Sequence, residues 1–142
     1  MRFPDDRRVR VSGKWCVYCG MAANTDEHYP PSTYSATGLI LPACSECNNL
    51  ASTEWPTNFE KRVAHVKSKL EWRHRKALKL PVWTADDLDE LSSEMRREIK
   101  IWQKRSRIAK QRIAWNAMSY LSSIDSGNVF AVLNARLNTS TD

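Results

Sequence analysis

The chain has 142 residues, of which 42% are hydrophobic and 27% charged, and its formal net charge at pH 7 is +6. This composition is typical of a globular protein that can bury one sizeable core, and the absence of a long apolar run, an internal repeat or a low-complexity linker argues against membrane-spanning, repeat and disordered proteins. The excess of Lys and Arg predicts an anionic partner.

The cysteines form two Cys-x-x-Cys pairs, Cys16 with Cys19 and Cys44 with Cys47, and these are the only cysteines of the chain. Four thiolates match the tetrahedral preference of Zn²⁺, and each pair directs two sulfurs toward one point. Two disulfides are the alternative, which the lack of a secretory signal pattern near residue 1 disfavours. We therefore expect a structural zinc site in an intracellular, cytoplasmic protein.

An acid, an imidazole and two prolines lie between the pairs, in the segment 25–31. A neutral imidazole accepts a proton near neutral pH, so His28 is the candidate general base. A carboxylate from Glu27 and the side-chain carbonyl of Asn48 are suitable ligands for Mg²⁺ or Mn²⁺, with Asp26 as the alternative carboxylate. This set predicts metal-dependent hydrolysis of a phosphodiester.

The backbone around His28 is expected to be irregular. Neighbours on a strand point to opposite faces, so Glu27 and His28 reach the same phosphate only if the strand is distorted there. Pro30 and Pro31 favour such a distortion and end any strand just past His28. Asn48 is expected near the start of a helix that begins close to Cys44.

Glu27-His28 followed by Pro31, and Cys44-x-x-Cys47 followed by Asn48, resemble the zinc-containing HNH endonucleases over residues 14–55. The resemblance implies a ββα-metal core, His28 as general base, a metal held by Glu27 and Asn48, and products with 5′-phosphate and 3′-hydroxyl ends. Small free-standing proteins of this family are common in bacteriophages, which suggests a phage origin.

The chain departs from the family pattern at three places. Glu27 stands where Asp is usual, Leu39 stands where the family has the Asn that braces the His loop, and no Lys follows Asn48 closely. Leu39 favours an alternative function, a non-catalytic zinc module that binds nucleic acid or protein. Retention of Glu27, His28 and Asn48 favours the nuclease, and a helical scaffold protein is a third interpretation.

The second half of the chain is predicted to be helical. Thr57 with Glu60 forms a capping-box pattern that starts a helix running to about Leu80, where Pro81 ends it. Within this helix the candidate nucleic-acid contacts lie mostly on one flank, and Trp72 is a candidate for stacking on a base. These candidate contacts are Arg62, Lys69, Arg73 and Lys76.

A second helix is predicted from Thr84, which can form a capping box with Asp87, to about Ile124, with a bend between residues 119 and 126. A short amphipathic stretch, 129–137, follows it. The apolar stripe of this helix, from Leu88 to Ile113, packs on the core or forms a dimer. The opposite face carries further candidate nucleic-acid contacts, namely Arg97, Lys100, Lys104 and Arg107.

The sequence therefore predicts an α+β protein, with a zinc-bound HNH module held by the four cysteines at residues 1–55 and a basic helical extension at 56–142 packed on it as one unit. The predicted activity is metal-dependent endonuclease action on nucleic acid, with double-stranded DNA as the main expectation and RNA as the alternative. No membrane association is expected.

Overall fold

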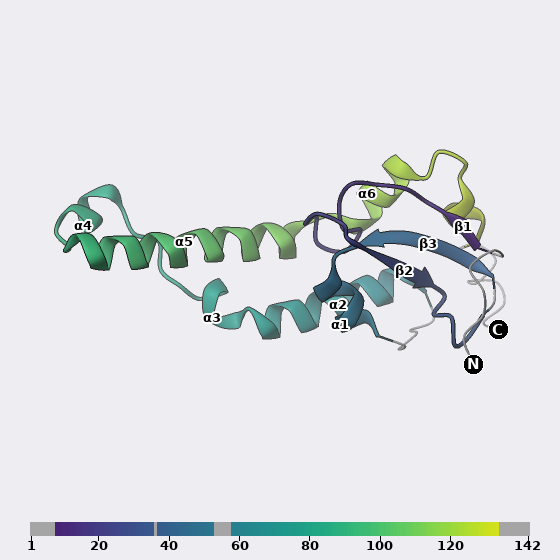
Figure 1. Ribbon diagram of the computed structural model, residues 1–142, viewed down its shortest axis with the longest axis horizontal. Helices are drawn as coiled ribbons and strands as arrows, with labels where there is room; N and C mark the ends of the chain where they lie inside the picture. Colours follow the sequence, from purple (N-terminus) through teal and green to yellow (C-terminus); the bar gives the residue numbers. More distant parts are fainter. Residues whose placement is uncertain (1–7, 36, 53–57, 134–142) are drawn as a thin grey trace.

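The computed structural model describes residues 8–35, 37–52 and 58–133, and its helices and strands confirm the α+β class (Figure 1). In chain order the elements are β1 (Arg8–Arg10), β2 (Thr25–Tyr29), β3 (Gly38–Ala43), α1 (Ser45–Ala51), α2 (Phe59–Arg73), α3 (Arg75–Leu78), α4 (Ala85–Asp89), α5 (Ser93–Ala114) and α6 (Ala117–Ile124). Among them, no helix combines the length and the apolar character needed to cross a membrane.

The three strands form one sheet in the order β1-β3-β2, and the sheet leads directly into α1. β2 pairs antiparallel with β3, residue for residue, from Thr25 opposite Ala43 to Tyr29 opposite Leu39. β1 is parallel to β3. The antiparallel pair and the following helix α1 make a small ββα unit.

The predicted distortion at His28 is not present. β2 keeps a regular register with β3 through Tyr29, and His28 lies opposite Ile40. Side chains alternate along a regular strand, so Glu27 and His28 point to opposite faces of the sheet. The prolines end the strand after Tyr29 but leave the backbone before it undistorted.

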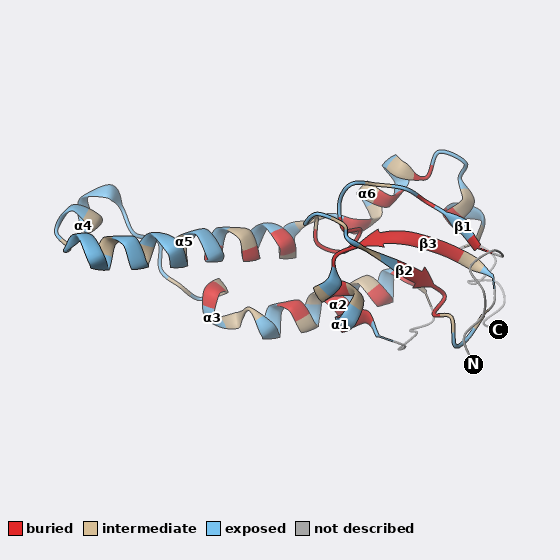
Figure 2. Cartoon of the chain, viewed as in Figure 1, coloured by how far each residue is buried: buried red, intermediate tan, exposed pale blue. Residues whose placement is uncertain are grey.

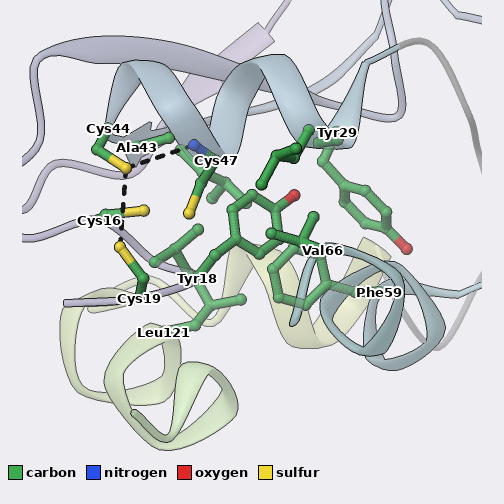
Figure 3. Packing of buried hydrophobic residues seen from close by; sticks show 14 of the residues in the cluster. Cys16, Tyr18, Cys19, Tyr29, Ala43, Cys44, Cys47, Phe59, Val66 and Leu121 are labelled. Carbon is green, nitrogen blue, oxygen red and sulfur yellow. Dashed lines mark hydrogen bonds between the residues drawn. The ribbon is translucent and has the colours of Figure 1, made fainter. Parts of the chain in front are cut away.

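The core combines residues from both halves of the chain (Figure 3). The ring of Phe59, on α2, lies 5.0 Å from the ring of Tyr29 on β2 and 5.8 Å from that of Tyr18 in the first cysteine turn. Leu121 of α6 is fully buried in the same cluster. The core therefore extends across the boundary that the sequence placed between residues 55 and 56.

An elongated arm extends from this core and ends at α4 (Figure 1). It is made of α3, the end of α2, and α5, whose 22 residues span about 33 Å. Most of its surface is exposed, and buried positions on α5 are confined to Ser106, Ala109 and Arg112, on the half nearer the core (Figure 2). The arm is thus a pair of helices with a narrow buried seam.

The first predicted helix forms, but its limits differ. α2 begins at Phe59, and the side chain of Asn58 accepts a hydrogen bond of 2.8 Å from the backbone N–H of Lys61. The predicted cap, Thr57, lies outside the described residues. The backbone leaves helical geometry at His74, so residues 75–78 form the separate short helix α3.

The second predicted helix is divided into three. The capping box of Thr84 and Asp87 is confirmed, but α4 ends at Asp89 and Ser92 caps the new helix α5. The helix ends at Ile124, inside the range 119–126 where a break or bend was predicted, but a second break at residues 115 and 116, where the side chain of Asn116 caps α6, was not predicted. Two local caps override the continuous apolar periodicity. Of the stretch 129–137, residues 129–133 are helical and the rest lies outside the described residues.

Candidate functional site

The four cysteine sulfurs meet in the core, and all lie within 4.8 Å of one another (Figure 3). A tetrahedron built on Zn–S bonds of about 2.3 Å has edges of about 3.8 Å, and the Sγ atoms of Cys19 and Cys44 are 3.7 Å apart. None of the four cysteines forms a disulfide. The cluster therefore fits a closed, structural zinc ion.

Each cysteine pair is held by its own local geometry. Cys44 is the N-cap of α1, and its sulfur accepts a hydrogen bond from the backbone N–H of Cys47 at 3.4 Å. The first turn ends at Gly20, whose φ is +79° and where a Cβ would overlap the ring of Trp115. Only glycine satisfies both the backbone angle and the close approach.

Arg112 of α5 reaches the cysteine cluster from the arm. Its guanidinium lies 3.8 Å from Cys44 Sγ and 3.9 Å from Cys47 Sγ, and 2.6 Å from a carboxylate oxygen of Glu46. Burial lowers the pKa of Arg112, but the cysteine sulfurs and Glu46 raise it by a larger amount. The pKa of Arg112 is therefore above its ordinary value. A Zn²⁺ ion held by four thiolates would carry a net charge of −2, which Arg112 would partly offset.

The base of the arm is also fixed by Lys67 of α2. Its ammonium donates to the carbonyls of Arg112, Ile113 and Trp115 at 2.6, 3.1 and 2.8 Å. These carbonyls lie at the C-terminal end of α5 and have no partner within that helix. Lys67 therefore ends α5 and ties it to α2, and nothing in the sequence pattern marked this role.

His28 and Asp26 lie on one face of the sheet. His28 is 8% exposed, and the carboxylate of Asp26, two residues earlier, is paired with Arg10 of β1 at 2.7 Å. The hydrogen bond from Arg10 holds the pKa of Asp26 below its usual range. Asp26, the alternative metal ligand, and His28, the candidate base, therefore lie on the same face of the sheet. The carboxylate of Asp26 is paired with the exposed side chain of Arg10.

Glu27 lies on the other face and is 3% exposed. Its carboxylate accepts a hydrogen bond of 2.7 Å from the Tyr18 hydroxyl and one of 3.3 Å from Arg62. Burial raises the pKa of Glu27, although Arg62 and Tyr18 oppose this shift. Both carboxylate oxygens therefore have protein donors.

Arg62 is fully buried beside Glu27. Its guanidinium also donates to the Tyr18 hydroxyl at 3.1 Å and to the carbonyl of Ser52 at 3.2 Å. The sequence prediction that Arg62 contacts nucleic acid does not fit this position, because its side chain is enclosed in the core.

Asn48 connects α1 to β2. Its side-chain amide donates to the hydroxyl of Thr25 at 3.0 Å and to the backbone carbonyl of Asp26 at 2.9 Å. Both donor bonds use Nδ2, so they leave the side-chain carbonyl to coordinate a cation. Asn48 therefore lies at the outer edge of β2, beside Thr25 and the backbone of Asp26.

Leu39 takes no part in a polar site. It is buried opposite Tyr29 in the core. A brace for the segment after His28 comes instead from Arg8, which donates to the carbonyl of Leu39 at 3.2 Å and to that of Ser35 at 2.7 Å. Sequence reasoning missed Arg8, because no motif connects it to His28.

The remaining predicted basic residues lie along the arm. Lys69 donates to the carbonyl of Leu50 at 3.3 Å, and Arg73 pairs with Glu46 at 3.3 Å. The others are exposed, namely Lys76, Arg97, Lys100, Lys104 and Arg107.

No family model matches the chain, and no curated protein or solved structure is significantly similar to it.

Proposed function

We propose that the protein is a zinc-stabilised, divalent-metal-dependent endonuclease that hydrolyses phosphodiester bonds in nucleic acid, with double-stranded DNA as the main substrate. The observation that carries the proposal is the bonding of Asn48, which fastens α1 to the strand that bears His28, within a ββα unit built next to the cysteine cluster. The order of these residues resembles the HNH endonucleases. A cytoplasmic phage protein is the setting that this resemblance suggests.

In this proposal His28 removes a proton from the attacking water, because a neutral imidazole is the side chain best matched to that step near pH 7. The cysteine cluster serves as scaffold, since a closed site leaves no open coordination position. When bound, Mg²⁺ or Mn²⁺ would neutralise charge on the phosphate. The side-chain carbonyl of Asn48 would be one of its ligands.

Two carboxylates compete for the role of metal ligand. The resemblance assigns it to Glu27, which must first give up its buried bonds to Arg62 and Tyr18. Asp26 must give up only an exposed pair with Arg10, and exposed pairs contribute about 1 kcal/mol or less. The smaller cost of releasing its carboxylate therefore favours Asp26 as the metal ligand, whereas the resemblance to the HNH endonucleases favours Glu27.

Nicking of supercoiled plasmid by zinc-loaded protein tests the proposal. We expect Mg²⁺-dependent nicking that His28→Ala lowers by about 10²-fold or more, because a general base contributes about 10²- to 10⁴-fold. His65→Ala, on α2 outside the candidate site, is the matched control and should retain activity. Nicking that survives His28→Ala, or that needs no divalent cation, would identify a contaminant or another site.

Asp26→Asn separates the two carboxylates. If Asp26 holds the cation, this variant should need at least about tenfold more Mg²⁺ for half-maximal nicking while its melting temperature stays near that of the wild type, since the lost ion pair is exposed. Arg10→Gln, which frees the Asp26 carboxylate, should not raise the Mg²⁺ requirement. An unchanged Mg²⁺ titration for Asp26→Asn would assign the cation to Glu27.

A non-catalytic zinc module is the second candidate. It is favoured by the saturation of Glu27 by Tyr18 and Arg62 and by the burial of Leu39. Folded, zinc-loaded protein that retards DNA but never nicks it would support this alternative.

A further inference from the structure

A cleft of about 580 Å³ lies between the end of α2 and α3 on one wall and α5 on the other. Its lining, drawn from the described residues, contains no Asp or Glu. Six basic side chains line it, namely Arg73, His74, Arg75, Lys76, Arg105 and Arg112. A concave, low-dielectric surface of one charge sign concentrates ligands of the opposite sign.

The inner end of the cleft is electrostatically balanced. Glu46 of α1 pairs there with Arg73, His74 and Arg112 at 3.3, 3.1 and 2.6 Å. Arg112 also lies against the cysteine sulfurs. These three basic groups are therefore committed to holding the arm on the zinc module.

The outer part of the cleft has no such balance, because no carboxylate of the described residues lines it beside Arg75, Lys76 and Arg105. The two arginines are pre-oriented by stacking: Arg75 Cζ lies 4.1 Å from the ring centroid of Trp72, and Arg105 Cζ lies 4.9 Å from that of Trp102. Stacking fixes the plane of a guanidinium and leaves N–H groups at its edge to bind phosphate oxygens.

We propose that this cleft binds the phosphodiester backbone of DNA, with Arg75 and Lys76 contacting phosphates from one wall and Arg105 from the other. The choice of DNA as the polyanion rests on the proposed function. The inner end of the cleft meets Glu46 of α1, the short helix that also carries Asn48 two residues later, on its other side.

This assignment differs from the basic stripe expected from the sequence. Arg105 and Arg107 are two residues apart on α5 and are therefore separated by about 200° around the helix. Arg107 lies with Lys110 on the side that faces Pro81 and Val82, away from the cleft. The stripe that runs through Lys100, Lys104 and Arg107 therefore lies about 100–160° around the helix from Arg105.

Fluorescence anisotropy of a labelled DNA duplex, with zinc-loaded protein and no added Mg²⁺, tests the proposal. Lys76→Gln with Arg105→Gln should raise Kd at least about tenfold and reduce the slope of log K against log salt by about 1.8, since each phosphate contact contributes about 0.9. Lys14→Gln with Lys110→Gln removes the same charge from exposed positions outside the cleft and should change Kd less than about threefold. Melting temperature and zinc content check that each variant is folded.

A third variant, Lys100→Gln with Lys104→Gln, tests the sequence-predicted stripe. A loss of affinity equal to or greater than that of the cleft variant would overturn the cleft assignment, as would wild-type affinity in the cleft variant or no DNA binding by the wild type. Cleft-dependent binding without any nicking in the plasmid assay would leave the cleft in place and remove the proposed nuclease.

Discussion

Cys47→Ser, or removal of zinc by a chelator, is expected to unfold the ββα unit and the core around it. Cys47 is fully buried, and the cysteines contact the same core that holds Tyr18 and Phe59. Structural zinc binding contributes about 10–16 kcal/mol in zinc-finger peptides, comparable to or larger than the total stability of a typical domain, about 5–15 kcal/mol. Loss of the metal would also leave the buried sulfurs, two of which lie beside the guanidinium of Arg112, without the Zn²⁺ ion that they share.

Circular dichroism during thermal unfolding, together with metal analysis, measures this effect. We expect one zinc per chain, loss of the cooperative transition after chelation, and its return on adding Zn²⁺ but not Mg²⁺. Met21→Ala, at an exposed position directly after the first cysteine turn, is the matched control and should melt close to the wild type. A chelated protein with the wild-type melting curve would show that the cluster is not a structural metal site.

The four-cysteine cluster could be predicted because its signal is local. Each Cys-x-x-Cys spacing directs two sulfurs to one side of a turn whatever the rest of the chain does. The cap at Thr84 was predictable for the same reason, since its partner Asp87 is three residues away. Ser92 and Asn116 are equally local caps, but a continuous apolar periodicity concealed them.

The roles of the carboxylates could not be predicted, because they depend on which face of β2 meets the core. Alternation along a strand shows that Asp26 and Glu27 point to opposite faces, but not which face is buried. That choice is made by Arg62 and Tyr18, and Arg62 lies 35 residues from Glu27 in the sequence. The cleft of the arm likewise depends on how α3 packs against α5, which no local pattern fixes.

Arg62→Ala is expected to destabilise the protein by about 3–5 kcal/mol, since it leaves the buried Glu27 carboxylate without its cation. This corresponds to a fall of about 10–20 °C in melting temperature. Glu27→Gln with Arg62→Met removes both charges and should recover much of the loss, because replacing a buried ion pair by uncharged groups is often neutral. Lys61→Ala, on the exposed side of the same helix turn, should change stability by less than about 0.5 kcal/mol.

The effect of Arg62→Ala should depend on pH. Burial already raises the pKa of Glu27, and loss of Arg62 removes an interaction that opposes this shift. A carboxyl whose pKa is higher in the folded than in the unfolded state binds more protons when folded, so stability falls as pH rises through that range. Urea unfolding should therefore show a smaller loss for Arg62→Ala near pH 5 than near pH 8, and a loss independent of pH would mean that Glu27 finds another cation.

Added Mg²⁺ tests whether a divalent cation can replace Arg62 beside Glu27. Glu27 is also the carboxylate that the HNH resemblance assigns to the catalytic metal. If the carboxylate and Asn48 together form a metal site that Arg62 blocks, Mg²⁺ should raise the melting temperature of Arg62→Ala and leave the wild type unchanged. If Mg²⁺ stabilises neither the wild type nor Arg62→Ala, the role of the Arg62–Glu27 pair is structural only. The catalytic cation would then belong with Asp26, on the face of β2 that carries His28.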